Sequence, residues 1–144
     1  MYEMYNTEKD LEKDGIWFEP NPNFRIKIAR AGGANKKYQA MIDKLAKPHR
    51  RAIAAEAIDP EVLNEILKEA FVKTVVRGWQ VKVNGEFVDG IADPKDVNNI
   101  LPYNVENVAM VFREFNDLFL DVKNMAETSV AFRKLEQEEE LKNL

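Results

Sequence analysis

The segment DPEVLNEILKEAFVKTVVRG, residues 59–78, constrains the fold most, because it combines a helix start signal with a helical period. Asp59 can cap a helix, and Pro60 stands at the first helical position, where its missing N–H costs nothing. Gly78 is a residue type that commonly ends a helix. The apolar positions recur every three or four residues and form one face: Val62, Leu63, Ile66, Leu67, Ala70 and Phe71. We therefore predict a helix over about 60–77.

Two other segments alternate with the period of half-buried strands. Residues 24–28, FRIKI, alternate apolar and basic side chains, and they follow the turn-rich sequence PNPN at 20–23. This pattern predicts a β-hairpin near residues 16–30. Residues 79–90 also alternate, and they contain Asn84-Gly85, the preferred pair for a two-residue hairpin turn.

Most of the remaining chain has helical patterns. The predicted helices cover residues 34–47, a short piece within 49–57, a segment capped by Asn104, and a long segment capped by Asn116 or Asp117 that continues toward the C-terminus. Residues 1–14 have no strong period, so we expect a loose N-terminal arm, and the acidic residues 136–144 are expected to fray. The prediction is a single α+β domain over residues 1–144, predominantly α-helical, with small β-hairpins packed against a helical bundle.

Positive charge is concentrated in one part of an otherwise acidic chain. Residues 25–51 contain nine Lys or Arg and one acidic residue, Asp43, while the whole chain has 21 basic and 25 acidic residues. The nine cations are the predicted partner-binding residues: Arg25, Lys27, Arg30, Lys36, Lys37, Lys44, Lys47, Arg50 and Arg51.

The residue types argue against catalysis and against bound metals or cofactors. The chain has no cysteine, its only histidine is His49 and its only serine is Ser129. No spacing matches an EF-hand loop or a His-based zinc site, and Gly32-Gly33 lacks the rest of a phosphate-binding loop. We therefore expect neither a catalytic site nor a cofactor or metal site.

Localisation is also predicted from composition. No apolar run approaches the roughly 20 residues that span a bilayer. The polar, acidic N-terminus does not resemble a signal peptide, and the absence of cysteine suits a reducing compartment. We expect a cytosolic protein with no membrane partner.

Three interpretations of the basic cluster follow from the residues. It can contact an acidic protein surface, it can bind nucleic acid, or it can be a solvated face without a partner. The negative charge of the whole chain and the absence of a recognised nucleic-acid motif disfavour nucleic acid.

The order and spacing of several residues resemble the tail assembly chaperones of long-tailed bacteriophages. The resemblance runs from about residue 14 to the C-terminus and departs from the family pattern at 80–102, which is longer than expected. The residues that fit the pattern are Phe24, Ile26, Arg30, Ala31, Asn35, Lys37, Tyr38, Gly78, Trp79, Tyr103, Asn107, Phe119, Ala126 and Phe132.

This resemblance implies a function. Such chaperones bind the long, helical, aggregation-prone tape measure protein and keep it soluble while the tail tube forms around it. They need no cofactor, act in the host cytoplasm and are absent from the mature virion. The tail tube protein and further copies of the chain are additional candidate partners. A small nucleic-acid-binding protein that uses residues 25–51 and a structural tail-completion protein remain the alternatives.

Overall fold

The structure, a computed structural model, describes residues 1–132 and has a mixed α+β fold in which helix predominates. The helices are α1 (Lys9–Asp14), α2 (Lys36–Ala46), α3 (Arg50–Ala54), α4 (Pro60–Thr74), α5 (Val105–Glu114) and α6 (Asn116–Glu127), with short 3-10 turns at Glu3–Tyr5, Lys47–His49 and Ser129–Phe132. The strands are β1 (Ile16–Asn21), β2 (Phe24–Ile28), β3 (Val76–Val83), β4 (Glu86–Asp89), β5 (Ile91–Asp93) and β6 (Asp96–Leu101). The predicted fold class is confirmed, as are the hairpin at 16–30 and the helices that start at Pro60 and after Asn104.

Four strands form one antiparallel sheet in the order β1-β2-β3-β4, and β5 and β6 form a separate hairpin. Directly paired residues point to the same side of a sheet, so the register separates two faces. Phe18, Ile26 and Trp79 lie in one row on the inner face. The neighbouring row, Trp17, Lys27 and Gly78, lies on the outer face, where cations and exposed aromatic rings alternate.

The inner face of the sheet packs against α5 and α6. Phe112 on α5 lies with its ring centroid 6.0 Å from that of Trp79 and 5.4 Å from that of Phe119 on α6. Phe71 extends this aromatic row into α4, with its centroid 5.3 Å from that of Phe119. Full burial of each such side chain contributes about 1.5–3 kcal/mol to the stability of the fold. The ring contacts of this row join three helices to the sheet.

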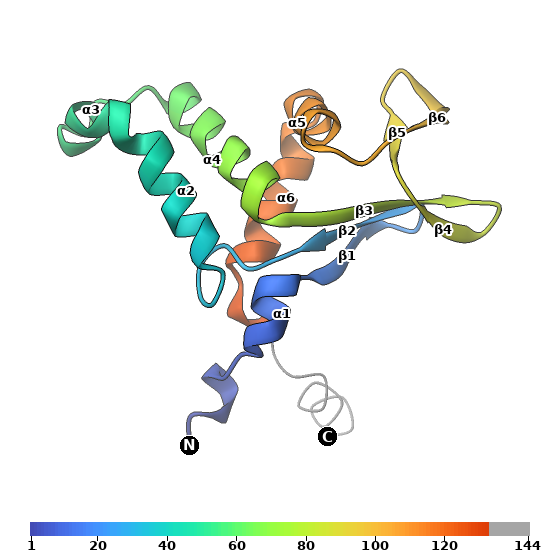
Figure 1. The fold of residues 1–144 in the computed structure, drawn as a ribbon, viewed down its shortest axis with the longest axis horizontal. Coiled ribbons are helices and arrows are strands. Elements are labelled where there is room, and N and C mark those ends of the chain that lie inside the picture. The colour runs from blue at the N-terminus through green and yellow to red at the C-terminus, as the bar shows by residue number, and fades with distance from the viewer. Residues whose placement is uncertain (133–144) are drawn as a thin grey trace.

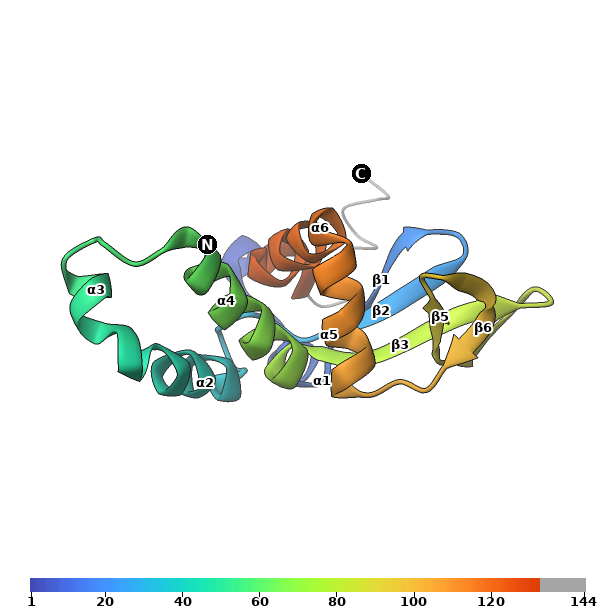
Figure 2. The same cartoon turned by 90° about the horizontal axis from the view of Figure 1, so that it is seen from above.

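Three of the helices and two of the hairpins lie at opposite ends of the molecule. Figures 1 and 2 show α2, α3 and α4 as a helical arm at one end, with the β3–β4 and β5–β6 hairpins at the other. Within the arm, α2 packs on α4, and the Tyr38 and Phe71 rings meet edge-on with centroids 5.5 Å apart. None of the described helices is both long and apolar enough to cross a membrane.

The expectation of a loose arm at residues 1–14 is wrong for 9–14, which form α1. Glu12 on this helix is 2% exposed, and the backbone N–H of Glu8 donates to the carbonyl of Phe132 at 2.7 Å. A single turn and a half of helix has no clear sequence period, because it is held by these tertiary contacts rather than by an apolar stripe.

The predicted end of the helix at 60–77 is also wrong. The helix α4 ends at Thr74, and β3 begins at Val76. Val75 and Val76 are buried against the sheet core, and β-branched residues suit a strand. Gly78 is therefore a strand residue, and a Cβ placed there would lie 3.3 Å from the Trp17 ring.

The C-terminal helix is shorter than predicted, and its cap is different. Helix α6 runs from Asn116 to Glu127, so neither Asn116 nor Asp117 is its N-cap. A hydrogen bond from the Thr128 hydroxyl to the Asn124 carbonyl lies at the helix end. The rest of the predicted helix beyond Phe132, and the predicted frayed tail at 136–144, lie outside the described residues.

The β5–β6 hairpin falls in the segment where the family resemblance departs from its pattern. Its strands pair Ile91 with Leu101 and Ala92 with Ile100. Of the residues in these two strands, only Ile91 is fully buried. The segment therefore has little of the apolar and polar alternation by which a strand is predicted from sequence. The Asn84-Gly85 turn that precedes it joins β3 to β4 as predicted.

Candidate partner-binding site

The nine cations predicted as one cluster separate into three groups in the structure. Arg25 and Arg30 make contacts within the protein. Lys27, Lys36 and Lys37 line a surface depression, and the other four lie at the far end of the helical arm. The prediction that all nine form one surface is therefore not supported by their positions.

Arg25 lies on the outer face of the sheet between two aromatic rings. Its guanidinium carbon is 4.4 Å from the Trp17 ring centroid and 4.1 Å from that of Phe87. Its Nε and Nη2 donate to Oε1 of Gln80 at 2.8 and 2.6 Å. These contacts hold β1, β2, β3 and β4 together, which is a structural role for the side chain.

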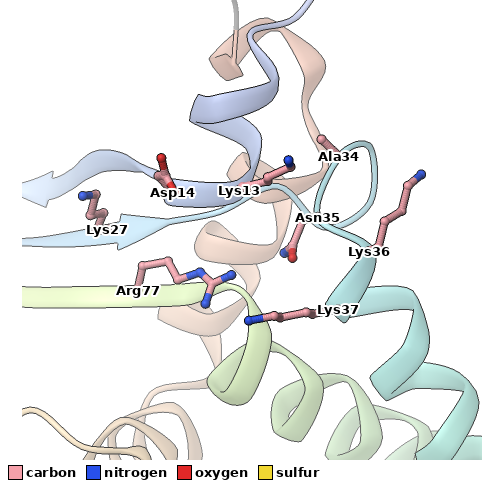
Figure 3. A pocket seen from close by; sticks show the side chains of 8 residues that line it. All are labelled: Lys13, Asp14, Lys27, Ala34, Asn35, Lys36, Lys37 and Arg77. Atoms are coloured by element: carbon pink, nitrogen blue, oxygen red, sulfur yellow. The ribbon is translucent and has the colours of Figure 1, made fainter.

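Lys27, Lys36 and Lys37 join two cations that the sequence analysis did not select. Lys13 on α1 and Arg77 on β3 line the same depression, which has a volume of about 770 Å³ (Figure 3). We call this surface the basic depression, and its lining residues are Lys13, Asp14, Lys27, Ala34, Asn35, Lys36, Lys37 and Arg77. Lys13 and Arg77 could be found only from the strand register and from the position of α1, neither of which the sequence specifies.

The charges in the basic depression are largely uncompensated. Its five cations face one carboxylate, Asp14, and no ion pair involves any of them among residues 1–132. The Nε of Arg77 is buried and has no hydrogen-bond partner within the same described part of the chain. In Figure 3, Arg77 and Lys37 extend toward one another from β3 and α2.

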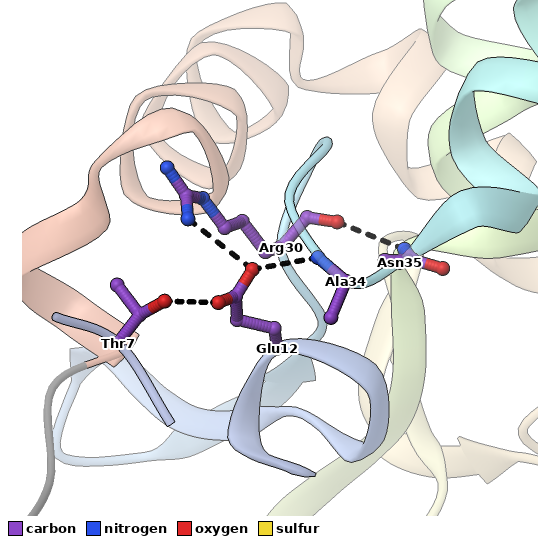
Figure 4. Close-up of polar contacts among 5 residues, drawn as sticks. All are labelled: Thr7, Glu12, Arg30, Ala34 and Asn35. Carbon is purple, nitrogen blue, oxygen red and sulfur yellow. Dashed lines mark hydrogen bonds and ion pairs between the residues drawn. The ribbon is translucent and has the colours of Figure 1, made fainter. Parts of the chain in front are cut away.

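Glu12 is a buried carboxylate on α1 that fixes the loop before α2, which forms part of the wall of the basic depression (Figure 4). Its Oε2 accepts from the backbone N–H of Ala34 at 2.8 Å and from Nη1 of Arg30 at 3.2 Å, and its Oε1 accepts from the Thr7 hydroxyl. Burial alone raises the pKa of Glu12, but these hydrogen bonds and the charge of Arg30 outweigh it and hold the pKa below its ordinary value. Gly33 has φ +53°, and any Cβ there would collide with Glu12.

Asn35 fixes the start of α2 to the end of α4. Its side chain is 3% exposed, and its Nδ2 donates to the carbonyls of Arg30 at 2.8 Å and Thr74 at 2.9 Å. The side chain is therefore occupied and does not cap α2, whose N-terminal N–H groups have no side-chain acceptor. The positive end of this helix opens beside the basic depression.

The remaining cations lie at the tip of the helical arm and are exposed: Lys44, Lys47, Arg50 and Arg51. We call them the tip cations. They make no ion pair within residues 1–132. They carry the same sign of charge as the cations of the basic depression, but they do not line it.

A second surface feature lies between α4 and α5. This α4–α5 groove has a volume of about 670 Å³, and its lining residues are Glu61, Asn64, Glu65, Lys68, Glu69, Val72, Lys73, Val105, Ala109 and Arg113. Val105, which is 45% exposed, and the half-buried Ala109 contribute apolar surface, while Val72 is buried beneath them. Charges of both signs surround them. None of these residues is among the nine cations predicted from the sequence.

No group of three or more His, Cys, Asp or Glu that could hold a metal ion occurs among residues 1–132. His49 is half-buried at the end of the Lys47–His49 turn, beside the tip cations.

Comparison with known protein families gives a match over most of the chain. The family model described as "YdaY prophage protein" matches residues 33–143 of the chain. This range includes α2 through α6, five of the eight lining residues of the basic depression and the whole α4–α5 groove. No curated protein and no solved structure matches the chain.

Proposed function

We propose a function from one premise: the chain belongs to the YdaY prophage protein family, and it is therefore a bacteriophage or prophage protein. In this proposal the chain is a tail assembly chaperone. It binds the tape measure protein and keeps it soluble in the host cytoplasm while tail tube subunits assemble, and it is left out of the finished particle. It acts without catalysis and without a cofactor.

The α4–α5 groove is the observation that carries this proposal. A client helix with one apolar face needs an apolar strip between two helices, with charged residues at its margins. The groove offers the exposed Val105 and the half-buried Ala109 as apolar surface, above the buried Val72. Glu65 and Lys68 are among the charges beside it, so a helix with mixed charge on its polar face can pair on either side.

The resemblance in sequence supports the same function, although most of the residues that carry it are structural. Ile26, Asn35, Trp79 and Phe119 are buried, and Arg30 pairs with Glu12. A pattern made of such residues supports a shared fold, and a shared fold alone does not establish a shared function. The proposed client therefore needs a direct test.

The test is co-expression of the chain with the tape measure protein encoded in the same phage genome. The expected result is that the wild-type chain moves the tape measure protein from the insoluble to the soluble fraction and co-purifies with it. Val105→Glu should abolish this effect, because a carboxylate replaces apolar surface in the groove. Glutamate suits the first turn of α5, so the fold should persist.

The matched control is Val97→Glu on β6, where the valine is 69% exposed and lies outside the groove. This variant should solubilise the client as well as the wild type does. A tape measure protein that stays insoluble beside the wild-type chain would contradict the proposal. Stoichiometric presence of the chain in purified particles would favour a structural tail-completion protein instead.

A further inference from the structure

We propose that the basic depression is a docking site for an acidic protein segment, one that carries several carboxylates close together. The inference rests on the residues of the depression and does not depend on the proposed client or on the α4–α5 groove. Four elements converge on the site, and each contributes at least one cation: α1, β2, α2 and β3.

The first argument is uncompensated charge. Five cations and one carboxylate leave an excess of four positive charges in a space of about 770 Å³, on a chain whose net charge is −4. Like charges held together raise the free energy of the folded chain, and an anion that enters offsets this cost. The depression is open to solvent and is large enough to admit several carboxylate side chains.

The second argument is the position of Lys36 and Lys37 in the first turn of α2. The N-terminus of a helix carries partial positive charge, and lysine there is unfavourable. The first turn of this helix has no acidic residue and no side-chain cap. A local preference broken in this way, at a helix end that lines the depression, is consistent with an anion from outside completing the site.

The third argument is that the walls are fixed before any ligand arrives. Glu12 ties α1 to the Ala34 backbone, and Asn35 ties the start of α2 to the end of α4. These hydrogen bonds fix the backbone from which the cations extend, so binding does not have to order the walls of the depression.

Two features favour an acidic protein segment over nucleic acid. A nucleic acid is a long polyanion and interacts with the field of the whole chain, which is net negative. A short acidic segment interacts mainly with the local positive charge. Asp14 within the lining also disfavours a phosphate dianion more than it disfavours single carboxylates.

The experiment measures binding of a fluorescein-labelled deca-glutamate peptide to the full chain by fluorescence anisotropy at low salt. A single-stranded DNA oligonucleotide of matched charge and inorganic phosphate serve as competing probes. The depression variant is Lys36→Glu with Lys37→Glu, and the control is Lys44→Glu with Lys47→Glu, which reverses the same number of exposed charges at the tip of the arm.

The expected result is that the wild type and the control bind the peptide with similar Kd, while the depression variant binds at least tenfold more weakly. A neutralising variant, Lys37→Gln with Arg77→Gln, should also weaken binding. It introduces no carboxylate, so it separates the loss of positive charge from the gain of negative charge. The proposal is overturned by absence of peptide binding, by equal losses in the depression and tip variants, by tighter binding of the oligonucleotide, or by full displacement of the peptide by equimolar phosphate.

Discussion

At the scale of single residues, the contacts of Glu12 predict a measurable change in the free energy of unfolding when it is substituted. It is a buried carboxylate whose three hydrogen-bond donors come from residues 7, 30 and 34, so it joins segments that are separate in sequence. Removal of its charge leaves the Arg30 guanidinium without its partner. We expect Glu12→Gln to reduce the free energy of unfolding by about 1–3 kcal/mol at neutral pH.

The same residue predicts a dependence on pH. The folded-state pKa of Glu12 lies below the ordinary value of 4.5, so its stabilisation is fully present above about pH 4.5 and is lost as the pH falls through the folded-state pKa. Urea denaturation of the wild type and Glu12→Gln should therefore give a difference that shrinks below about pH 4.5. Glu19→Gln, at an exposed position of β1, is the control and should show no such difference. A difference that stays constant down to pH 2 would contradict this account.

Asn35 supports a second prediction at the same scale. Its Nδ2 donates to two carbonyls, and Asn35→Asp would place a carboxylate oxygen against both of them. An unsatisfied buried charge is more costly than a lost neutral hydrogen bond, so we expect a loss of at least about 2 kcal/mol in the free energy of unfolding. Asn98→Asp on β6 is the control, since Asn98 is exposed and its loss should fall within about 0.5 kcal/mol. Equal losses in the two variants would show that the two hydrogen bonds are not important.

At the scale of elements, the N-terminus of α2 gives a prediction in which stability and binding change in opposite directions. Lys36→Glu with Lys37→Glu places two acids at the positive end of the helix and removes two cations from the basic depression. Each favourable charge at a helix terminus contributes about 0.3–1 kcal/mol, so thermal or urea denaturation should show a more stable chain. The same variant should lose affinity for the acidic peptide. A less stable variant would mean that these lysines support the fold, and would remove the second argument for the docking site.

The sequence could predict those elements whose signals are local. Asp59 with Pro60 marks the start of α4, the alternation at 24–28 marks β2, and Asn84-Gly85 marks the turn from β3 to β4, and each signal lies within a few residues. The end of α4 was missed because Gly78 resembles a helix stop, while its actual environment is the Trp17 ring from another strand. Tertiary contact decided this boundary, and local propensity did not.

The same difference between local sequence signals and tertiary contacts applies to the candidate site. Lys36 and Lys37 were predicted as partner-binding residues because they belong to the nine cations concentrated in residues 25–51. Lys13 and Arg77 were missed, since they join the site through α1 and through the register of β3 with β2. Arg25 lies apart from them in the structure, and the two rings and the amide that it contacts come from strands β1, β3 and β4.

At the scale of the whole molecule, the two candidate surfaces differ in chemistry. In the two proposals, the acidic segment interacts with the basic depression through charge, and the client helix interacts with the α4–α5 groove through burial of apolar surface. Salt separates these mechanisms, because the Debye length falls from about 10 Å at 0.1 M to about 3 Å at 1 M, while apolar burial is not screened.

We therefore expect the affinity for the acidic peptide to fall at least tenfold between 0.05 M and 0.5 M NaCl, and the affinity for the client to fall much less. The depression variant should have little salt dependence left for the peptide. The Val105→Glu variant should retain the wild-type salt dependence of peptide binding, since Val105 lies in the groove and outside the depression. Anisotropy for the peptide and co-purification yield for the client, measured over the same salt series, give the comparison. Equal salt dependence of both partners would mean that they share one electrostatic surface, and the assignment of two separate sites would be wrong.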